Sequence, residues 1–341
     1  MSFDPSATRR IGKRDVSVSL LGAGTAPFGS TAREDSDASI ARTFATLYDA
    51  GLRYFDTAPF YGLGVAEHRL GANLRHIDRR SVIVSTKIGR LLRPVAGGTS
   101  PGIGGGASPF EVVFDYSYDA TMRSLEHSLQ RLGTNAIDIV LIHDVNRRWQ
   151  GDEVEARYRE AMAGAHRALV DLRAQGTIKA FGVGVNDWSI LLRFAADGDF
   201  DCFMLAGRYT LLDHTALDTF MPDCVRRGIS VLMAAPFNSG ILATGARPGA
   251  TYFYTSADAD VMGRTREIED VCNRHGVTLA AAALQFPLAH PIVASVVTGI
   301  RTAAEAEANI AHCRFAIPGD FWEELKQRRL IAVAAPVPSG P

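Results

Sequence analysis

The chain has 341 residues, of which 47% are hydrophobic and 21% are charged, and this is enough apolar sequence for one large α/β barrel or two ordinary domains. Its 36 Lys and Arg residues nearly cancel its 37 Asp and Glu residues, so charge gives no reason to expect nucleic acid or an anionic membrane as a partner. The N-terminal stretch "MSFDPSATRR" has no apolar signal core, and no segment approaches about 18 uninterrupted apolar residues. The four cysteines form no CxxC pair, so we expect a cytoplasmic protein with buried thiols.

Short β-branched runs alternate with longer amphipathic stretches along the whole chain. The sequence predicts eight strands, at 18–22, 53–57, 82–87, 137–143, 179–185, 201–206, 229–235 and 294–299. Helical patterns lie at 39–51, 118–133, 158–176, 188–198 and 217–228. Strands that are apolar on both faces and separated by helices indicate a parallel sheet covered by helices. Eight such units close most simply into a (β/α)8 TIM barrel, so we expect residues 1–341 to form a single α/β barrel domain.

The alternative is an open, doubly wound sheet, which carries a dinucleotide fingerprint after its first strand. The stretch "LLGAGTAPFG" has Gly22 and Gly24 but no third glycine three residues later. Pro27 follows in place of an opening helix. The barrel is therefore favoured.

Two segments lie outside the repeat. Residues 8–18 read as an N-terminal β-hairpin that turns at Gly12 and Lys13. Residues 90–115 form a long Gly- and Pro-rich insertion after the third strand, which we expect to be a flexible loop over the active-site face. Its glycines resemble a phosphate-binding loop, but no strand leads into them and no helix follows at once; they are Gly102, Gly104, Gly105 and Gly106.

Ionisable residues stand at or just beyond the ends of three predicted strands. Asp56 ends the second strand, and Tyr61 follows in the next loop. Lys87 ends the third strand and His143 the fourth. Taken singly, each has an ordinary structural explanation, such as a helix cap, a solvated strand end or a satisfied core histidine. Because the active site of such a barrel lies at the carboxyl ends of its strands, we expect all four side chains to face one mouth.

Together these residues make a coherent acid–base catalyst. Reduction of a carbonyl requires a hydride at carbon and a proton at oxygen, and a tyrosine with an ordinary pKa of about 10 is a poor donor at neutral pH. We expect Lys87 to lower the pKa of Tyr61, and Asp56 to hold the lysine charged and oriented. His143 would fix the substrate oxygen by hydrogen bonding. In the oxidative direction the Tyr61 phenolate would act as the base.

These four residues, each in its strand context, resemble the catalytic tetrad of the aldo-keto reductase superfamily. The resemblance implies a barrel that binds NAD(P) in extended form without a Rossmann domain. The segments "FDTAPFYG", "IDIVLIHDVN", "FGVGVN" and "AGRYTLLD" look most like the D-threo-aldose 1-dehydrogenase group. That group includes L-fucose dehydrogenases and is close to L-galactose dehydrogenases and pyridoxal 4-dehydrogenase. Such enzymes oxidise the anomeric hydroxyl of a sugar to a lactone.

The resemblance also implies cofactor contacts. Asn186 would hold the nicotinamide carboxamide, Tyr209 would pack on the nicotinamide ring, and Ala206 stands where the superfamily often has a glutamine. "APFNSGILATG" resembles the pyrophosphate loop and "TGIRTAAEAEAN" the adenosine clamp. The full set of implied cofactor residues is Gly24, Thr25, Asp56, Asn186, Tyr209, Pro236, Phe237, Asn238, Gly240, Leu242, Gly299, Arg301, Glu305 and Asn309.

The adenosine clamp bears on the choice of cofactor. Members that prefer NADPH commonly place cations where Gly299 and Glu305 stand here. Glu305 beside a 2′-phosphate would be a like-charge contact, although Arg301 could compensate for it. We therefore expect NAD to be preferred, with NADP as the alternative. The histidines show no HExxH or paired-ligand spacing, so we expect no metal.

The substrate is expected to be a small sugar or aldehyde. Phe28, Phe60 and Trp149 are placed to line the mouth with His143, and Arg147 lies beside the tryptophan; Trp149 could equally pack its loop against the barrel. The leading hypothesis is an NAD-dependent sugar 1-dehydrogenase. An NAD(P)H-linked aldehyde reductase or a pyridoxal-type dehydrogenase would use the same tetrad. A cofactor-sensing regulatory subunit of a channel is the hypothesis from a different class, and the oligomeric state stays open.

Overall fold

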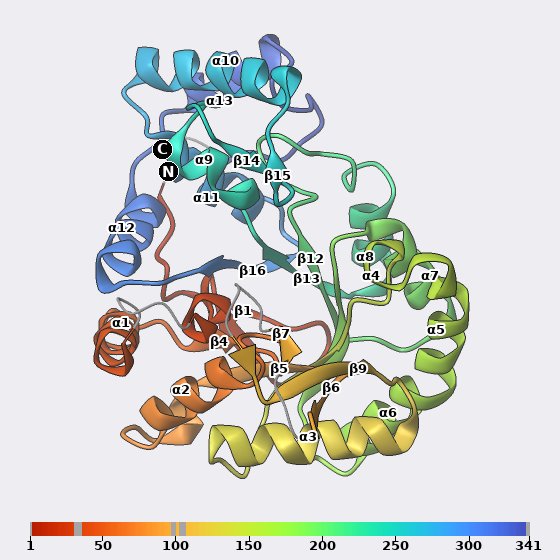
Figure 1. The fold of residues 1–341 in the computed structure, drawn as a ribbon. Coiled ribbons are helices and arrows are strands. Elements are labelled where there is room, and N and C mark those ends of the chain that lie inside the picture. The colour runs from red at the N-terminus through yellow and green to blue at the C-terminus, as the bar shows by residue number, and fades with distance from the viewer. Residues whose placement is uncertain (1, 31–35, 97–99, 102–106, 339–341) are drawn as a thin grey trace.

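The computed structural model describes residues 2–30, 36–96, 100–101 and 107–338. Eight parallel strands close into a barrel, and helices surround it (Figure 1). In spatial order the barrel strands are β10 (Ile139–His143), β11 (Ala180–Val185), β12 (Cys202–Ala206), β13 (Ser230–Ala234), β16 (Val293–Gly299), β3 (Leu21–Gly24), β4 (Tyr54–Asp56) and β5 (Ile83–Ile88). The predicted (β/α)8 barrel is confirmed.

The helices follow from apolar faces with recognisable ends. In the helix predicted at 118–133, Ser117 caps the first turn by accepting a hydrogen bond from the Ala120 amide, and Gly133 ends the helix at φ 59°. The α-helices of the described residues are α1 (Asp37–Asp49), α2 (Val65–Leu74), α3 (Tyr118–Leu132), α4 (Arg147–Gln150), α5 (Val154–Glu160), α6 (Arg167–Ala174), α7 (Trp188–Asp197), α8 (Phe220–Arg227), α9 (Ile241–Thr244), α10 (Ala259–His275), α11 (Leu279–Leu288), α12 (Ala303–Arg314) and α13 (Gly319–Gln327). Helices α1 and α12, from opposite ends of the chain, pack side by side where the barrel closes (Figure 1).

The helix predicted at 158–176 begins earlier and is not uniform. Helices α5 and α6 are joined by a π-helical segment, Ala161–His166, so one helical rod runs from residue 154 to 174. Gly164 in that segment lies against the start of α3, where an added Cβ would stand 2.5 Å from the Tyr116 carbonyl oxygen. The wider turn therefore lets two helices approach closely at a glycine.

The N-terminal hairpin closes one end of the barrel. Strands β1 (Thr8–Arg10) and β2 (Ser17–Ser19) pair antiparallel, and Val16 and Val18 are buried among residues of the barrel interior. Gly12 turns the chain at φ 50°. The strand predicted at 18–22 is therefore divided: its first residues pair in the hairpin, and the barrel strand begins only at Leu21.

The insertion after β5 is more ordered than the sequence predicted. Strands β6 (Arg90–Pro94) and β9 (Phe110–Phe114) pair antiparallel along their whole length, and the short strands β7 (Ser100–Pro101) and β8 (Ala107–Ser108) continue the ribbon. The sequence did not predict these strands, although "RLLRP" and "FEVVF" are long enough to pair. A cross-strand ion pair joins Arg93 to Glu111. The four glycines of the insertion, for which the sequence did not favour a phosphate-binding loop, lie outside the described residues.

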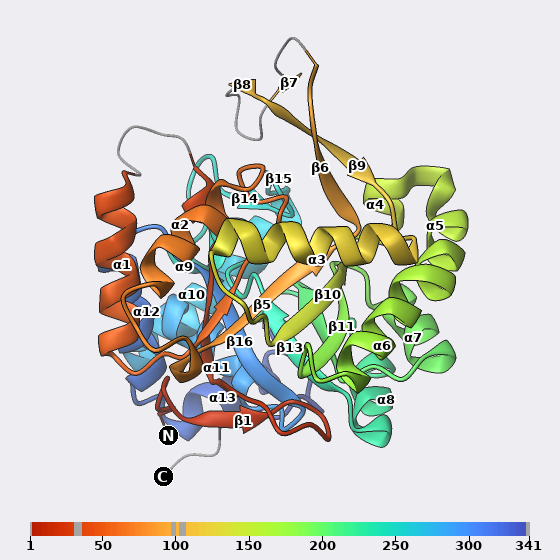
Figure 2. The same cartoon turned by 90° about the horizontal axis from the view of Figure 1, so that it is seen from below.

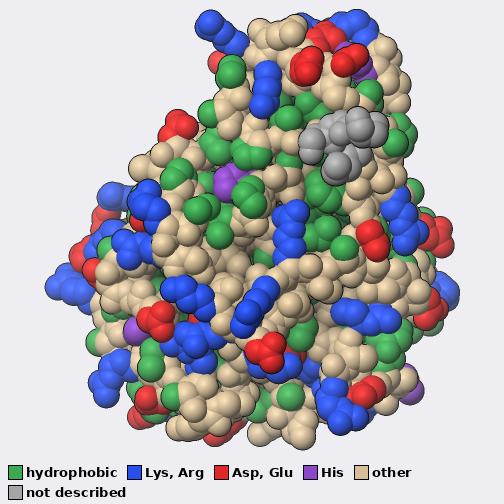
Figure 3. Space-filling view, turned by 180° about the vertical axis from the view of Figure 1, so that it is seen from behind, with side chains coloured by type: hydrophobic (Ala, Val, Ile, Leu, Met, Phe, Trp, Pro, Cys, Tyr) green, Lys and Arg blue, Asp and Glu red, His purple; other side chains and the backbone are tan. Residues whose placement is uncertain are grey.

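The two ends of the barrel have different structures. The ribbon β6–β9 projects from the end opposite the hairpin β1–β2, and α4 lies at the same end as the ribbon (Figure 2). Positive and negative side chains are interspersed over the back of the molecule (Figure 3). Among the described residues, no helix is both long and apolar enough to span a membrane. All four cysteines are free and buried, as predicted.

Candidate active site

Asp56 and Lys87 form a buried ion pair between neighbouring strands. Asp56 is the last residue of β4, and Lys87 is the last but one of β5. The Lys87 Nζ lies 2.6 Å from Asp56 Oδ2 and also donates to the Thr57 carbonyl oxygen at 2.9 Å. Asp56 Oδ1 accepts a hydrogen bond from the Ser85 hydroxyl at 2.6 Å. Both charges are only 2% exposed, so each depends on the other for its compensation.

Tyr61 and His143 complete the group. The Lys87 Nζ lies 4.7 Å from the centre of the Tyr61 ring. His143, the last residue of β10, stands with its ring perpendicular to that of Tyr61 at a centroid distance of 6.2 Å. The structure therefore brings the predicted tetrad together at the carboxyl ends of three neighbouring strands. Their catalytic roles remain predictions.

A close backbone approach holds Tyr61 in place. Gly62 has φ 61°, and a Cβ added to Gly29 would lie 2.5 Å from the Gly62 nitrogen, so the two turns touch where only glycines fit. Phe28 is 1% exposed in a small apolar cluster against which Tyr61 packs. Phe28 thus packs against the Tyr61 ring and is not among the residues that line the cavity, contrary to its predicted role as a substrate wall.

The local environment shifts the pKa of each group. Burial raises the pKa of Tyr61 and Lys87 lowers it, with a net rise to about 12. The predicted influence of the lysine is present, but desolvation outweighs it. Burial lowers the pKa of Lys87, yet the charges of Asp56 and Tyr61 more than compensate and raise it. Burial, Arg90 and Lys87 hold the pKa of His143 well below its usual value, so this imidazole is neutral at neutral pH.

Sequence analysis did not single out Asp144 and Arg90, which adjoin the tetrad. Asp144 follows His143 directly and has a left-handed backbone at φ 56°. Its Oδ2 lies 3.2 Å from the His143 Nε2 and 2.5 Å from the Arg90 Nη2. The position of Asp144 at a strand end was a usable signal. Arg90 gave none, because its burial depends on aromatic rings distant in the chain.

Aromatic rings form one wall of the site. The Arg90 guanidinium lies 3.8 Å from the centre of the Phe60 ring and 4.1 Å from that of Trp149. Phe60 and Trp149 both line the cavity, in agreement with their predicted placement. Arg147 points away and pairs with the exposed Asp152; its neighbour Arg148 lines the cavity in its stead.

The tetrad opens into a cavity of about 590 Å³. The cavity also includes Tyr254, which reaches it from the turn between the short strands β14 (Thr251–Tyr252) and β15 (Thr255–Ser256). No sequence signal marked this residue. Small residues form a further part of the lining, the small-residue wall, beside Val185, Met204 and Val297; they are Gly24, Gly184, Ala206, Ala234, Ala235 and Gly299.

This small-residue wall fits a flat nicotinamide. Gly24 and Gly299 are paired neighbours on β3 and β16, and a Cβ on Gly24 would lie 3.1 Å from the Thr298 carbonyl oxygen. The adjoining Thr25 is fully buried, and its hydroxyl has no hydrogen-bond partner in the described part of the chain. The small side chains of the wall leave room for a flat ring such as a nicotinamide. Asn186 lines the same cavity, as predicted.

Tyr209 does not lie at this cavity. Its ring is fully buried, 5.1 Å from the ring centre of Phe286 and 5.8 Å from that of His290. The residue lies just beyond the end of β12, and its side chain is directed outward, toward α11. The predicted packing of Tyr209 on the nicotinamide ring is therefore not supported by its position.

The loop after β13 has an unusual backbone. Asn238 and Ser239 have φ values of 46° and 62°, and Gly240 follows at 107°. Consecutive turns of this kind can direct backbone amides toward an anion. The Asn238 side chain accepts from the Thr210 hydroxyl and donates to the Gly207 carbonyl, and Leu242 is fully buried. The pyrophosphate contact expected at Pro236, Phe237 and their neighbours stays a prediction, and backbone groups are the ones that could make it.

The segment after β16 has partly structural contacts. The Glu305 carboxylate accepts a hydrogen bond from the Arg301 amide at 2.8 Å, and Thr302 caps α12. Asn309 is buried, with its amide 3.4 Å from the Thr298 hydroxyl. Glu305 is nevertheless exposed at its helix end and open to solvent beside Arg301. No group of three His, Cys, Asp or Glu side chains within the described ranges is placed to hold a metal ion.

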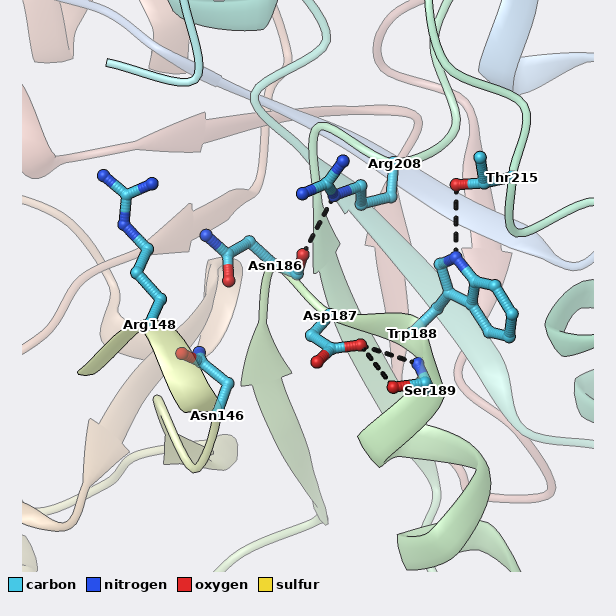
Figure 4. Close-up of a pocket in the computed structure, with 8 residues that line it drawn as sticks. All are labelled: Asn146, Arg148, Asn186, Asp187, Trp188, Ser189, Arg208 and Thr215. Carbon is cyan, nitrogen blue, oxygen red and sulfur yellow. Dashed lines mark hydrogen bonds between the residues drawn. The ribbon is translucent and has the colours of Figure 1, made fainter. Parts of the chain in front are cut away.

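A second hollow of about 420 Å³ adjoins the cavity and shares Arg148 and Asn186 with it. Figure 4 shows the Asn186 side chain directed toward Arg148, while its backbone oxygen accepts a hydrogen bond from Arg208. Asp187 is occupied as the cap of α7 through Ser189. This hollow is the outer margin of the active-site mouth.

Comparison with known proteins agrees with this geometry. Residues 20–329 match the model of the aldo/keto reductase family. Pyridoxal 4-dehydrogenase of Microbacterium luteolum is 40% identical over 344 residues, which cover 97% of this chain and 100% of that protein. D-threo-aldose 1-dehydrogenase of a Pseudomonas species is 36% identical over 323 residues, covering 93% and 95%. The solved holo form of an aldo-keto reductase from Bacillus halodurans shares the fold, with a TM-score of 0.73 at 23% identity and coverage of 96% and 97%. The chain belongs to the aldo/keto reductase family and is an NAD(P)-dependent oxidoreductase that acts on CH–OH donors.

Proposed function

We propose that this enzyme oxidises the hydroxyl of a cyclic hemiacetal to a lactone, with NAD as the preferred cofactor. The observation that carries the proposal is the buried group of Tyr61, Lys87, Asp56 and His143 at one edge of a cavity of about 590 Å³. Such a group moves one proton at a substrate oxygen. When bound, the nicotinamide supplies the hydride chemistry at the adjacent carbon.

Each residue of the tetrad has a separate task. Tyr61 takes the proton from the substrate hydroxyl, and the Lys87 ammonium stabilises the phenolate that does so. Asp56 keeps the ammonium charged and fixed by its 2.6 Å contact. The neutral His143 has a single N–H, which on Nε2 would turn from Asp144 Oδ2 to the substrate oxygen. Gly24, Asn186 and Gly299 would hold the nicotinamide against the small-residue wall.

The substrate class is supported by the two relatives. By their names, one acts on aldoses and the other on pyridoxal, and both molecules close into internal hemiacetals. The rings of Phe60 and Trp149 would pack on the face of a pyranose or of a pyridine equally well. We propose an aldose oxidised at C1 as the first candidate. Pyridoxal is the second, favoured by the 40% identity over almost the whole chain.

The preference for NAD is proposed from Glu305. Its carboxylate is exposed at the start of α12, where we expect the adenosine ribose by resemblance to the family. A 2′-phosphate at that position would face a like charge.

Absorbance of the reduced nicotinamide tests the proposal directly. The protein is supplied with NAD or NADP and with L-fucose, L-galactose, D-arabinose, L-rhamnose or pyridoxal. We expect faster reduction of NAD than of NADP, and formation of a lactone from an aldose, from pyridoxal or from both. Tyr61→Phe should abolish turnover and leave cofactor binding nearly intact. Tyr118→Phe, which alters a half-buried tyrosine outside the cavity lining, serves as the control.

Two results would count against the proposal. If no donor in the panel reduces either cofactor although the cofactor binds, the hemiacetal substrate class is wrong. If Tyr61→Phe loses turnover and cofactor binding together, Tyr61 is a structural residue and the proposed mechanism fails.

A further inference from the structure

Asp144 is a carboxylate in the active-site cavity for which the tetrad mechanism has no use. It directly follows His143 and lines the cavity together with His143 and Tyr61. Only 9% of the residue is exposed. A carboxylate that is buried at this depth beside the reacting groups requires compensation for its lost hydration.

Arg90 provides that compensation and fixes the orientation of the carboxylate. Its Nη2 lies 2.5 Å from Asp144 Oδ2, and the arginine is 1% exposed. The rings of Phe60 and Trp149 contact the guanidinium at 3.8 and 4.1 Å. Arg90 is the first residue of the ribbon strand β6, so the base of the insertion is what brings this charge into the site.

The two oxygens of Asp144 are unequally occupied. Oδ2 is in contact with both Arg90 and the His143 Nε2 at 3.2 Å. Within the described part of the chain, Oδ1 has only a long contact, 3.5 Å, from the Asn146 amide. An ionised carboxylate offers about four acceptor positions. Asp144 therefore lines the cavity with a carboxylate that can accept further hydrogen bonds.

We propose that Asp144 determines substrate specificity by accepting a hydrogen bond from a second hydroxyl of the substrate, next to the reacting hemiacetal hydroxyl. The inference rests on the proposed function. The reacting oxygen would lie between Tyr61 and His143, and Asp144 adjoins His143, so the next oxygen along the substrate meets this carboxylate. Both candidate substrates carry such a group: the 2-hydroxyl of an aldose and the phenolic 3-hydroxyl of pyridoxal.

A charged acceptor of this kind discriminates strongly. A hydrogen bond to an ionised group is stronger than one between neutral groups. A substrate without the donor leaves the buried carboxylate only partly paired, and the enzyme rejects it for that reason. The expected loss in kcat/KM is about tenfold to a hundredfold.

The first test needs only the unaltered protein. Each aldose that is oxidised is compared with its 2-deoxy analogue, which for D-arabinose is 2-deoxy-D-ribose, and pyridoxal is compared with 3-deoxypyridoxal. We expect kcat/KM to fall by about tenfold to a hundredfold when the second hydroxyl is removed. Equal kcat/KM for parent and deoxy compound would overturn the inference. If neither parent is oxidised, the proposed function fails and the inference fails with it.

Variants then test whether Asp144 is the residue that recognises the second hydroxyl. Asp144→Asn keeps the shape and loses the charge, so the ratio of parent to deoxy kcat/KM should fall. The double variant Arg90→Met, Asp144→Leu replaces the buried ion pair by apolar groups, leaves no unpaired charge, and should bring the ratio close to one. Asp152→Asn, an exposed carboxylate beyond α4, should keep the full ratio.

The ratio of parent to deoxy kcat/KM separates loss of recognition from loss of folded protein, because unfolding lowers the measured kcat/KM of both compounds by the same factor. An unchanged ratio in Asp144→Asn and in the double variant would mean that another residue reads the hydroxyl. If the double variant does not fold, the ratios of Asp144→Asn and of the unaltered protein still show whether Asp144 recognises the second hydroxyl.

Discussion

At the scale of single residues, the site is a balance between burial and charge. Lys87 lies 4.7 Å from the Tyr61 ring centre and favours the phenolate, whereas burial favours the neutral phenol. Burial prevails, and the pKa of Tyr61 rises to about 12. Without Asp56, the lysine would itself lose charge, because burial acts on it in the opposite direction. Asp56 thus affects the pKa of Tyr61 indirectly, because it keeps Lys87 charged.

Replacement of Lys87 by methionine should shift the pH dependence of oxidation. Oxidation requires the phenolate, so the rate of the unaltered enzyme should rise with pH toward the Tyr61 pKa of about 12, by about tenfold per pH unit below it. The loss of the ammonium raises this pKa further, so Lys87→Met should be slower at every pH below it. Initial rates of NAD reduction between pH 6 and about 10.5 measure the shift.

This substitution also leaves Asp56 buried without its partner, at a cost of about 3–5 kcal/mol in stability. The double variant Lys87→Met, Asp56→Asn removes that unpaired charge and should regain stability while retaining the shifted profile. A profile that coincides with that of the unaltered enzyme would remove Lys87 from the mechanism.

How far the site could be predicted depended on side-chain direction. Asp56, Lys87 and His143 could be found because parallel strands end at one mouth, and a strand end is visible in the sequence. Tyr209 and Phe28 were misplaced because a residue near a strand end can point inward or outward. Their rings turned toward apolar clusters that assemble from remote segments, and no local pattern shows this.

At the scale of elements, the sequence predicted the eight barrel strands but not the strands of the ribbon. Every strand of the barrel was predicted, because each is a short apolar run with helices on both sides. The ribbon β6–β9 was not, since its strands are half-exposed and their pairing partner lies across a Gly-rich segment. Its base delivers Arg90 to the active site, so the element that composition marked as a loop contributes a buried charge.

The hairpin β14–β15 carries backbone strain at its tip. Phe253 and Tyr254 have φ values of 48° and 64°, in the left-handed region where hairpins favour Asn and Gly. Each costs about 1–2 kcal/mol relative to a residue suited to that conformation. The Tyr254 ring is 71% exposed, lines the cavity mouth and lies 5.3 Å from the Arg148 guanidinium. Strain at a residue that faces the cavity suggests a contact with the substrate or cofactor.

Tyr254→Asn should therefore stabilise the protein and weaken binding. Asparagine tolerates the left-handed conformation, so the free energy of unfolding should rise by up to about 1 kcal/mol, as measured by urea titration. The lost ring should raise KM for the substrate or the cofactor severalfold. Phe253→Asn relieves strain at the neighbouring position and keeps the Tyr254 ring, so its KM values should stay closer to those of the unaltered protein. Unchanged KM values in Tyr254→Asn would show that the ring has no part in binding.

At the scale of the whole molecule, the barrel separates stability from function. The hairpin β1–β2 fills one end with apolar side chains, and the polar residues of the site occupy the other. Several histidines lie against aromatic rings. Burial lowers the pKa of His214 and of His290 to about 4, and holds that of His143 well below its usual value. The His214 Nε2 has no hydrogen-bond partner within the described residues.

These histidines should make the protein sensitive to mild acid. Below about pH 6.5 the unfolded chain binds a proton at each of them, whereas the folded chain does not until about pH 4 at His214 and His290. Stability is thus greatest above pH 6.5 and falls progressively as the pH is lowered toward 4. Urea titrations between pH 7.5 and 4.5 should show a steady decrease in the unfolding midpoint. His214→Gln removes one buried imidazole and should make the decrease shallower, whereas His76→Gln, at an exposed position, should leave it unchanged. A midpoint that stays constant down to pH 4.5 would mean that the enclosed imidazoles take up protons in the folded barrel as readily as in the unfolded chain.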